Sequence, residues 1–246
     1  MKHIKDRRTI RQYRKDDVAE PLLRRLFSEA SRTQTMGNLQ LYSVVVTRDA
    51  EMKHHLAPAH FNQPMVENAP VVLTICADFR RTTDWCDQRR ANPGYGNFLS
   101  FINAATDALL FTQTFCNLAE EEGLGCCFLG TTVYMPQLII DVLQLPQLVM
   151  PVATITLGWP DEEPPLSDRL GTDAFVHEET YQPYTPERID AFYGEKESLE
   201  ENKEFVRING KDTLAQVFTD CRYTKKDNEA MSAGLLEALK NQGFLD

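Results

Sequence analysis

The sequence predicts an α+β fold, in which a few strands pack against helices. Its composition is that of a globular protein with a core, since 42% of the 246 residues are hydrophobic and 25% are charged. Only a few short segments have the character of strands, whereas one apolar helical pattern runs through residues 98–122. A doubly wound parallel sheet would need more strands and shorter helices, so the α+β class fits the order of elements better.

The first fifteen residues form a basic segment in an acidic chain. They contain seven Lys and Arg residues against Asp6 alone, while the whole chain has a net charge of −10. Such a cluster needs either an anionic partner or a solvated face. Ile10 and Tyr13 are three residues apart, and this apolar spacing indicates that the segment packs against the protein instead of fraying.

The first half of the chain predicts a helix followed by two strands. Residues 20–33 place apolar side chains on one helical face. A polar loop at residues 33–38 leads to a β-rich run at residues 42–47. A helical stretch then leads to the second strand, at residues 70–77.

The second half is organised around the helix predicted for residues 98–122. Apolar and small side chains recur there at spacings of three and four, so we expect it to be buried against several neighbours or a partner subunit. It should end at Gly123, because glycine commonly follows a helix C-terminus. The other expected elements are strands at 126–129 and 152–157, a helix from Pro136, an irregular segment at 160–185, and a C-terminal helix with Met231, Leu235, Leu236 and Leu239 on its apolar face.

Charge, hydropathy and cysteine usage exclude several classes of protein. The acidic balance argues against a general nucleic-acid or anionic-membrane binder. No apolar run reaches the length of a membrane span, and the basic N-terminus has no apolar core of a secretory signal. The six cysteines form no C-x-x-C pair. A reducing, cytoplasmic location is the simplest expectation.

Residues 123–130 contain glycines at the spacings of two nucleotide-binding motifs. In the dinucleotide fingerprint, Phe128 replaces the third glycine, and the segment follows a helix and precedes a strand, the reverse of the required order. In the Walker A spacing, Thr131 stands where the phosphate-binding Lys must be. Both motifs fail. What remains is a glycine-flanked strand that either approaches a flat ligand or simply turns into the core.

No catalytic or metal-binding constellation is apparent. His54, His55 and His60 crowd together without an acidic residue at metal-ligand spacing, so we expect them at the surface. Cys126 and Cys127 alternate across a predicted buried strand, which favours core packing over redox chemistry. The chain is then either a binder or an enzyme whose cofactor supplies the chemistry, and the arginine cluster favours the second.

Five segments in order carry a resemblance to a known family. They are RRTIRQY at 7–13, NLQ at 38–40, CADF at 76–79, GLG through Gly130, and LGWP followed by LSDRL at 157–170. Together they resemble the FMN-dependent nitroreductases, and most closely their NADPH nitroreductase and flavin reductase subgroup. RRTIRQY is similar to the family's Arg-rich opening, and GLG through Gly130 resembles the subgroup's Gly-Leu-Gly-x-x-Tyr-Ile-Gly. The resemblance covers residues 4 to about 185.

The resemblance implies a nitroreductase-like α+β fold: a central, mainly antiparallel sheet flanked by helices in an intertwined homodimer. FMN would lie in clefts between the subunits, in a domain of residues 1–190, and residues 191–246 would form a helical extension. The activity implied is ping-pong hydride transfer from NADPH or NADH through FMN to nitroaromatics, quinones or flavins. The alternatives are a specialised member, such as a reductive dehalogenase or flavin-cleaving enzyme, and a flavin-binding protein without turnover.

The resemblance also carries cofactor-binding residues onto this chain. Arg7, Arg8 and Arg169 would contact the FMN phosphate, for which bidentate guanidinium groups are suited. Thr9 would add a hydroxyl or backbone contact. Arg11 would lie near flavin N1 and O2, where negative charge develops on reduction.

Further residues implied by the resemblance surround the flavin ring. They are Thr35 near the ribityl chain and pyrimidine ring, Gln63 at the ring edge, and Phe128, Leu129 and Gly130 beneath the ring.

Two departures and one open question accompany these assignments. Ser167 replaces the subgroup's usual Lys near the phosphate, and Phe128 replaces a Tyr. In the subgroup a basic loop beyond residue 195 takes the 2′-phosphate of NADPH. Arg207 and Lys211 are the candidates here, but their segment does not match cleanly, so the choice of donor stays open.

Overall fold

The computed structural model describes residues 3–245 and forms two compact units. One unit contains Met1–Pro165 together with Met231–Asp246, and the other is Leu166–Ala230. The second unit is therefore inserted between two parts of the first. The domain boundary predicted after residue 190 falls inside this second unit.

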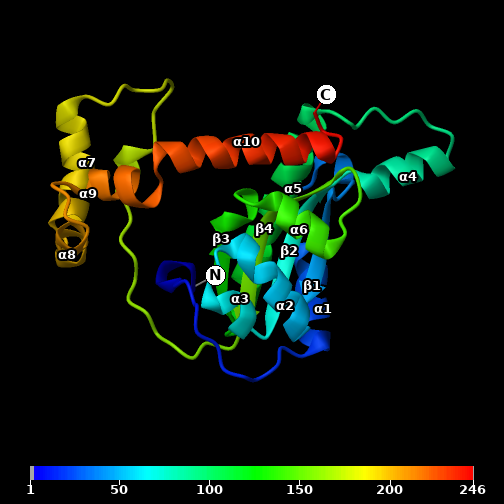
Figure 1. Ribbon diagram of the computed structural model, residues 1–246, viewed down its shortest axis with the longest axis horizontal. Helices are drawn as coiled ribbons and strands as arrows, with labels where there is room; N and C mark the ends of the chain where they lie inside the picture. Colours follow the sequence, from blue (N-terminus) through cyan, green and yellow to red (C-terminus); the bar gives the residue numbers. More distant parts are fainter. Residues whose placement is uncertain (1–2, 246) are drawn as a thin grey trace. The chain divides into compact units, whose positions relative to one another are not determined.

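A four-stranded antiparallel sheet forms the centre of the first unit (Figure 1). The order of the strands is β1-β2-β4-β3, so β1 and β3 form opposite edges. This confirms the predicted antiparallel character of the sheet. The strands are β1 (Tyr42–Thr47), β2 (Val71–Asp78), β3 (Gly125–Leu129) and β4 (Val149–Gly158).

Strand β4 begins three residues earlier than the sequence predicts. Pro151 lies inside the strand, where a residue without an N–H normally interrupts the hydrogen bonds between strands. The pairing between β2 and β4 shifts its register at Ile75 and Cys76, and Cys76 is the residue opposite Pro151. This irregularity accommodates the proline, as bulges in sheets commonly do.

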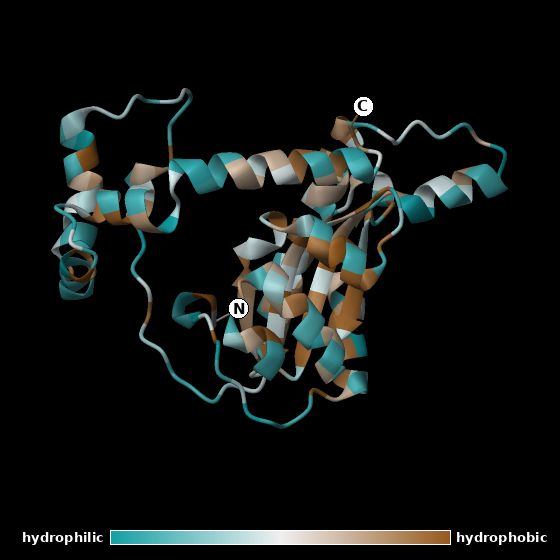
Figure 2. Ribbon diagram, in the orientation of Figure 1, coloured by the Kyte–Doolittle hydropathy of each residue, from teal (hydrophilic) through white to brown (hydrophobic). Residues whose placement is uncertain are grey.

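The two faces of the sheet are covered by different helices. Helices α5 (Phe98–Glu121) and α1 (Glu20–Ala30) cover one face, where alternate residues of β2 and β4 join the larger hydrophobic cluster. A smaller cluster involving helices α3 (Pro64–Asn68) and α6 (Pro136–Leu143) lies against Cys127 and Leu129 on the other face. Figure 2 shows the hydrophobic residues concentrated in the sheet and the helical faces against it.

Helix α5 closely follows the prediction from its periodicity. The Asn97 side chain caps its start by accepting a hydrogen bond from the N–H of Ser100, at 2.9 Å. Gly123 follows its end with φ +84°, a conformation that glycine adopts without strain. Ala104 and Ala108 are fully buried, and their small side chains allow the helix to lie close to the sheet.

Helix α4, at Arg80–Gln88, was not expected from the sequence. Most of its residues are polar or charged, and only Thr82 and Cys86 are buried. It therefore lacks the apolar stripe by which an amphipathic helix is recognised. The remaining helices of the first unit are α2 (Ala50–Leu56), α3 (Pro64–Asn68), α6 (Pro136–Leu143) and α10 (Lys225–Asn241), the last continuing from the second unit.

The second unit starts with a largely irregular stretch, as predicted for residues 160–185, interrupted by a short 3-10 turn. Its long segment is held by an ion pair of 2.7 Å between Asp168 and Lys196. The Arg188 guanidinium lies over the rings of Tyr184 and Phe192. Its helices are α7 (Pro186–Ser198), α8 (Glu200–Ile208), α9 (Leu214–Gln216) and a π-helical turn at Val217–Arg222.

Candidate functional site

The arginine segment, residues 7–14, lies beside edge strand β3 and the end of β4. The N–H of Ile10 donates to the carbonyl of Cys126 at 3.1 Å, and the N–H of Arg14 donates to that of Trp159 at 2.9 Å. Tyr13 forms an antiparallel bridge with Pro160. The prediction that this basic segment packs against the protein is therefore confirmed.

Two glycines allow the arginine segment to approach the sheet. A Cβ on Gly125 would lie 2.6–2.8 Å from three side-chain atoms of Ile10. A Cβ on Gly158 would lie 2.9 Å from the Tyr13 ring and 2.6 Å from Pro70. Packing therefore requires glycine at the second Gly of the GLG motif, against this segment, and at the Gly of LGWP, against this segment and Pro70.

The side chain of Tyr13 anchors the segment from inside. Its hydroxyl lies 2.6 Å from the carbonyl oxygen of Ile10, to which it donates, and 2.8 Å from the hydroxyl of Thr156 on β4. Burial raises the pKa of this phenol, with a smaller opposing effect from the hydrogen bond to Thr156. The ring therefore stays neutral and structural.

The loop after β4 forms hydrogen bonds with the arginine segment. The Oε1 atom of Glu162 accepts hydrogen bonds from the backbone N–H groups of both Arg11 and Gln12. The Nε of Arg8 donates to the carbonyl of Pro164 at 2.7 Å. Sequence reasoning missed Glu162, because nothing local relates it to residues about 150 positions earlier.

Three predicted phosphate- and flavin-binding arginines belong to this one segment. Arg7 pairs with Glu120 of α5, with 3.2 Å between Nε and Oε1. Burial raises the pKa of the Cys127 thiol on β3, and the positive charges of Arg11 and Arg7 oppose that rise. Both guanidinium groups therefore place positive charge near Cys127 of β3. A positive region next to this strand suits a phosphate or the reduced form of a flavin.

The end of β3 offers a surface for a flat ligand. Phe128 is 44% exposed on the α5 face of the strand, whereas Leu129 is buried on the other face. No atom of residues 3–245 lies within 4 Å of the position that a Cβ on Gly130 would take. Open space beside a glycine, at the end of the strand that the arginine segment flanks, is what a planar ring passing close to the backbone requires, so these residues fit FMN.

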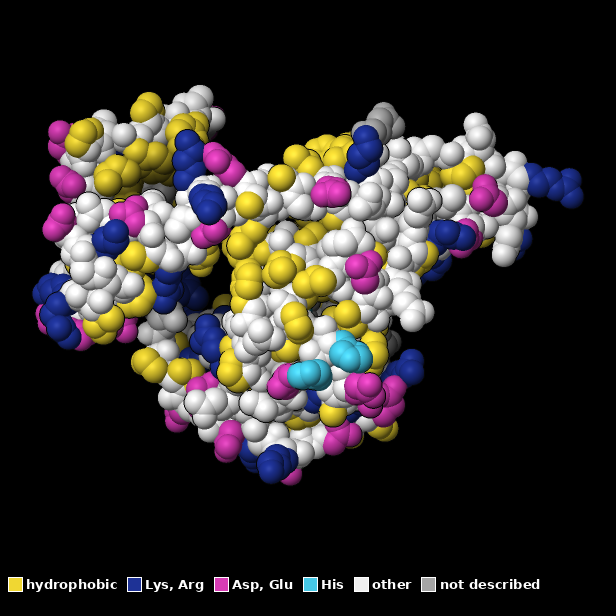
Figure 3. All heavy atoms as spheres, viewed as in Figure 1, with side chains coloured by type: hydrophobic (Ala, Val, Ile, Leu, Met, Phe, Trp, Pro, Cys, Tyr) yellow, Lys and Arg dark blue, Asp and Glu magenta, His cyan; other side chains and the backbone are white. Residues whose placement is uncertain are grey.

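Gln63 is brought to the same part of the fold. It precedes helix α3, and the turn before it contacts the residues that follow Gly130, since Nδ1 of His60 lies 2.8 Å from Oγ1 of Thr131. His60 is fully buried, so its predicted surface location is wrong. His54 and His55 are exposed on α2, as expected, and Figure 3 shows histidines at the surface.

A groove of about 590 Å³ runs between the arginine segment and α3. Arg11 and Lys15 supply positive charge on one side, and Asn68 supplies an amide on the other. Within residues 3–245 no group of His, Cys, Asp and Glu side chains could hold a metal ion.

Thr35 is not joined to the arginine segment within one chain. Its hydroxyl donates to Oδ2 of Asp107 at 2.5 Å and accepts from the N–H of Gln40 at 2.8 Å. Asp107 is buried in α5 and also accepts from the N–H groups of Met36 and Leu41. This loop leads into β1, at the edge of the sheet opposite β3. An acid in the middle of an apolar helix was the signal that could have revealed Asp107.

Arg169 and Ser167 belong to the second unit. The Arg169 guanidinium donates to the carbonyl of Asp168 at 2.7 Å. The assignment of Arg169 to the FMN phosphate stays a prediction.

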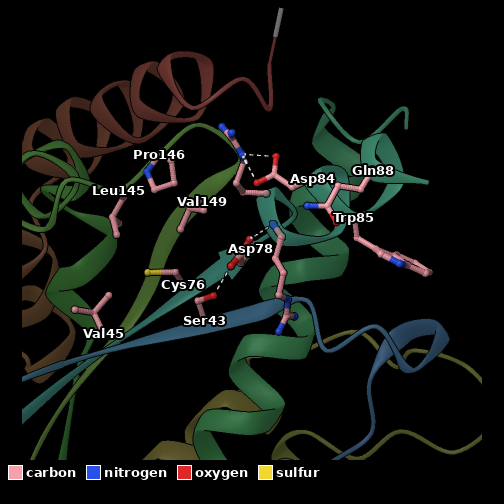
Figure 4. Close-up of a pocket in the computed structure, with 12 residues that line it drawn as sticks. Ser43, Val45, Cys76, Asp78, Asp84, Trp85, Gln88, Leu145, Pro146 and Val149 are labelled. Carbon is pink, nitrogen blue, oxygen red and sulfur yellow. Dashed lines mark hydrogen bonds and ion pairs between the residues drawn. The ribbon is translucent and has the colours of Figure 1, made fainter. Parts of the chain in front are cut away.

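A second cavity, of about 550 Å³, lies where α4 leaves the sheet (Figure 4). Its charged groups are engaged within the protein: Arg80 pairs with both oxygens of Asp84, and Asp78 accepts from the hydroxyl of Ser43. Arg81 donates to the carbonyl of Gln40. The arginines of this cavity are therefore already paired with a carboxylate or a carbonyl of the protein.

The family and its relatives agree with this geometry. The model of the nitroreductase family matches residues 4–159. A Bacillus subtilis protein named FMN reductase (NAD(P)H) is 32% identical over 248 residues, which cover 99% of this chain and 97% of the relative. The oxygen-insensitive NADPH nitroreductase of Salmonella typhimurium is 27% identical over 239 residues, covering 96% and 94%.

A solved structure of similar shape extends this agreement over the whole chain. The crystal structure of a Bacteroides fragilis protein is 60% identical, with a TM-score of 0.99 over 100% of both chains. The match of the family model to well over half of the sequence, the antiparallel sheet and the arginine segment lead to one conclusion. The chain belongs to the nitroreductase family.

Proposed function

We propose that this protein is an FMN-dependent NAD(P)H oxidoreductase that reduces nitroaromatics, quinones or flavins. The observation that carries the proposal is the arginine segment held along β3, the strand that ends at the open space beside Gly130. The names of the Bacillus and Salmonella relatives support the same enzyme class, cofactor and donor. All six cysteines are free thiols, which supports a reducing compartment such as the cytoplasm.

The residues of this chain would bind and tune the cofactor. Arg7 and Arg8 would hold the phosphate, Phe128 and Gly130 would lie along the ring, and Arg11 would place a fixed positive charge near it. When bound, FMN supplies the two-electron redox chemistry that no side chain provides. The protein adds orientation, electrostatics and a slot for a flat acceptor.

Anaerobic titration tests the function directly. The purified protein should have a flavin absorption spectrum that either NADPH or NADH bleaches, and a nitroarene or quinone should restore it. The relative rates of bleaching would give the donor preference. A flavin that neither nucleotide reduces would leave a flavin-binding protein without turnover, and a chain that takes up no FMN would contradict the proposal.

Arg8→Ala should weaken FMN binding by about 1.5–3 kcal/mol, or roughly 10- to 150-fold, the scale of a charge-assisted hydrogen bond. Two of its N–H groups donate to the carbonyls of Pro164 and Asp6, and among residues 3–245 the others have no partner, so a phosphate could accept from them. Fluorescence titration of FMN measures the effect. Arg14→Ala is the matched control, because Arg14 also bonds a proline carbonyl, that of Pro160. Equal affinities in both variants would refute the phosphate assignment.

Arg11→Ala should give a protein that still binds FMN but is harder to reduce. Removing a fixed cation near the ring destabilises the negative charge that develops on reduction, by an amount on the order of 1.4 kcal/mol, or about 30 mV for a two-electron couple. Spectroelectrochemistry measures the midpoint potential. An unchanged potential in the flavin-loaded variant would exclude this role for Arg11.

We also propose that the protein is a homodimer whose second subunit completes the site. Thr35 and the arginine segment lie at opposite edges of the sheet, three strand spacings or about 14 Å apart, which supports a site that takes Thr35 from the partner chain. Helix α5 also leaves large apolar side chains exposed, although it forms the centre of the core. They are Phe98, Leu99, Ile102, Leu109 and Leu110.

Leu109→Glu should therefore convert a dimer into a monomer and reduce FMN binding with it. A charge on an apolar interface costs its desolvation, commonly several kcal/mol when it is left unpaired. Light scattering gives the mass, and Leu138→Glu, the same change at an exposed leucine of α6, is the control. A wild-type protein that is monomeric with FMN bound would overturn the shared site.

A further inference from the structure

His60 is a buried histidine that the site described so far does not use. Its side chain is fully buried, and Nδ1 lies 2.8 Å from the hydroxyl of Thr131. Its Nε2 has no hydrogen-bond partner among residues 3–245. Burying an imidazole with one nitrogen unpaired costs free energy of folding, so the presence of His60 here calls for an explanation.

The turn that carries His60 is tightly closed and conformationally restricted. The N–H of Asn62 donates to the carbonyl of Ala57 at 2.9 Å, and the N–H of Gln63 donates to that of His60 at 3.2 Å. Phe61 and Asn62 both have positive φ, at +55° and +53°. Two successive non-glycine residues in this region persist only when surrounding contacts hold them.

Two side-chain contacts join this turn to the segment after β3. One is the hydrogen bond from His60 to Thr131, and the other is the contact of the Phe61 and Tyr134 rings, whose centroids are 6.3 Å apart. Thr131 directly follows Gly130, and Gln63 directly follows the restricted turn. The contacts thus connect the neighbours of two predicted site residues, Gln63 and Gly130, which are 67 positions apart in the sequence.

We propose that His60 is a positioning residue: its hydrogen bond to Thr131 sets the distance between Gln63 and the Gly130 backbone, and so the fit of the ring between them. This rests on the proposed FMN-binding function. His60 itself would touch neither cofactor nor substrate. Its effect would pass through the rigid turn on one side and through the residue after Gly130 on the other.

The neutral state of His60 agrees with this role. Burial lowers the pKa of the imidazole to about 4, so the ring carries one N–H at neutral pH. A protonated ring would carry two N–H groups, of which Nε2–H would have no acceptor among the described residues. The hydrogen bond to Thr131 is therefore made by a group whose protonation state stays constant over the physiological range.

The test compares variants of both partners in the FMN-loaded enzyme. Thr131→Val removes the hydroxyl at constant shape, and Thr131→Ser restores it. His60→Leu removes the ring nitrogens, and His60→Asn keeps a polar atom close to the place of Nδ1. His55→Leu, at an exposed position of α2, is the matched control. The readouts are the FMN dissociation constant by fluorescence, the flavin midpoint potential, and KM and kcat for one quinone.

The expected result is a loss of FMN affinity of about five- to tenfold in Thr131→Val and His60→Leu, the scale of one hydrogen bond. The double variant should lose no more than either single one, because both remove the same contact. Thr131→Ser and His60→Asn should recover most of the affinity. Where His60→Leu fails to fold, Thr131→Val and its serine counterpart still decide the matter.

Two other results would count against the inference in different ways. Variants that melt at lower temperature but bind FMN like the wild type, with unchanged potential and KM, would show that His60 only stabilises the fold. A wild-type protein that takes up no FMN would instead overturn the proposed function, and the positioning role with it. Additive losses in the double variant would exclude a shared contact.

Discussion

Gly125→Ala should destabilise the protein and release its arginine segment. The new Cβ would lie 2.6–2.8 Å from three atoms of Ile10, closer than carbon atoms approach, and Ile10 is held by its hydrogen bond to Cys126. Overpacking of this kind costs about 1–3 kcal/mol. Because relief of the clash must move the segment away from β3, we expect FMN affinity to fall together with the free energy of unfolding.

Denaturant unfolding and FMN titration measure the two effects of Gly125→Ala. Gly94→Ala is the control, since no atom of the described part of the chain lies within 4 Å of the position of its Cβ. Gly130→Ala should separate the two effects, with stability preserved and FMN binding weakened, because its Cβ would occupy space left open for the ring. Equal stability of the Gly125→Ala and Gly94→Ala variants would contradict the close approach of Ile10.

Acid should destabilise the protein through His60. In the folded chain this histidine stays neutral down to about pH 4, whereas in the unfolded chain it takes up a proton near pH 6.5. Between these values the unfolded state binds more protons, so the free energy of unfolding falls as the pH is lowered. At about 1.4 kcal/mol for each pH unit of the interval, His60 should contribute a loss of about 3 kcal/mol by pH 4.

Urea unfolding at several pH values between 4 and 7 measures this effect in the wild type and in His60→Asn. Carboxylates titrate in both proteins, so the difference between the two curves isolates the buried imidazole. His55→Asn is the control, because it makes the same substitution at an exposed position of α2. Parallel curves for the wild type and His60→Asn would refute the buried neutral state.

The sequence predicted those helices and strands that are determined by residues within or next to them. The apolar spacing of residues 98–122, the cap at Asn97 and the glycine at 123 all lie within or next to the helix that they determine. The spacing of Ile10 and Tyr13 likewise predicted that a strongly basic segment would pack. Helix α4 was not predicted because it buries only two side chains and so has no apolar stripe. The start of β4 was not predicted because Pro151 fits in the strand only through the register shift in its pairing with β2.

The residues that hold the site together could not be predicted in this way. Glu162 binds the backbone of Arg11 from 151 positions away, and Asp107 orders the loop of Thr35 from 72 positions away. No local pattern relates such partners. His60 was expected at the surface because its neighbours His54 and His55 are exposed, whereas the turn at 57–63 directs it to Thr131.

The sequence by itself determined the fold class, the long central helix and the arginine segment, because periodicity, capping and charge act between neighbouring residues. Its motifs also led to the family. Only the tertiary structure decided why Gly125 and Gly158 must be glycine, where His60 lies, and that Thr35 and the arginines belong to opposite edges of the sheet. These three features depend on contacts between segments that are far apart in the sequence, and such contacts form only when the chain folds and the strands pair in their order.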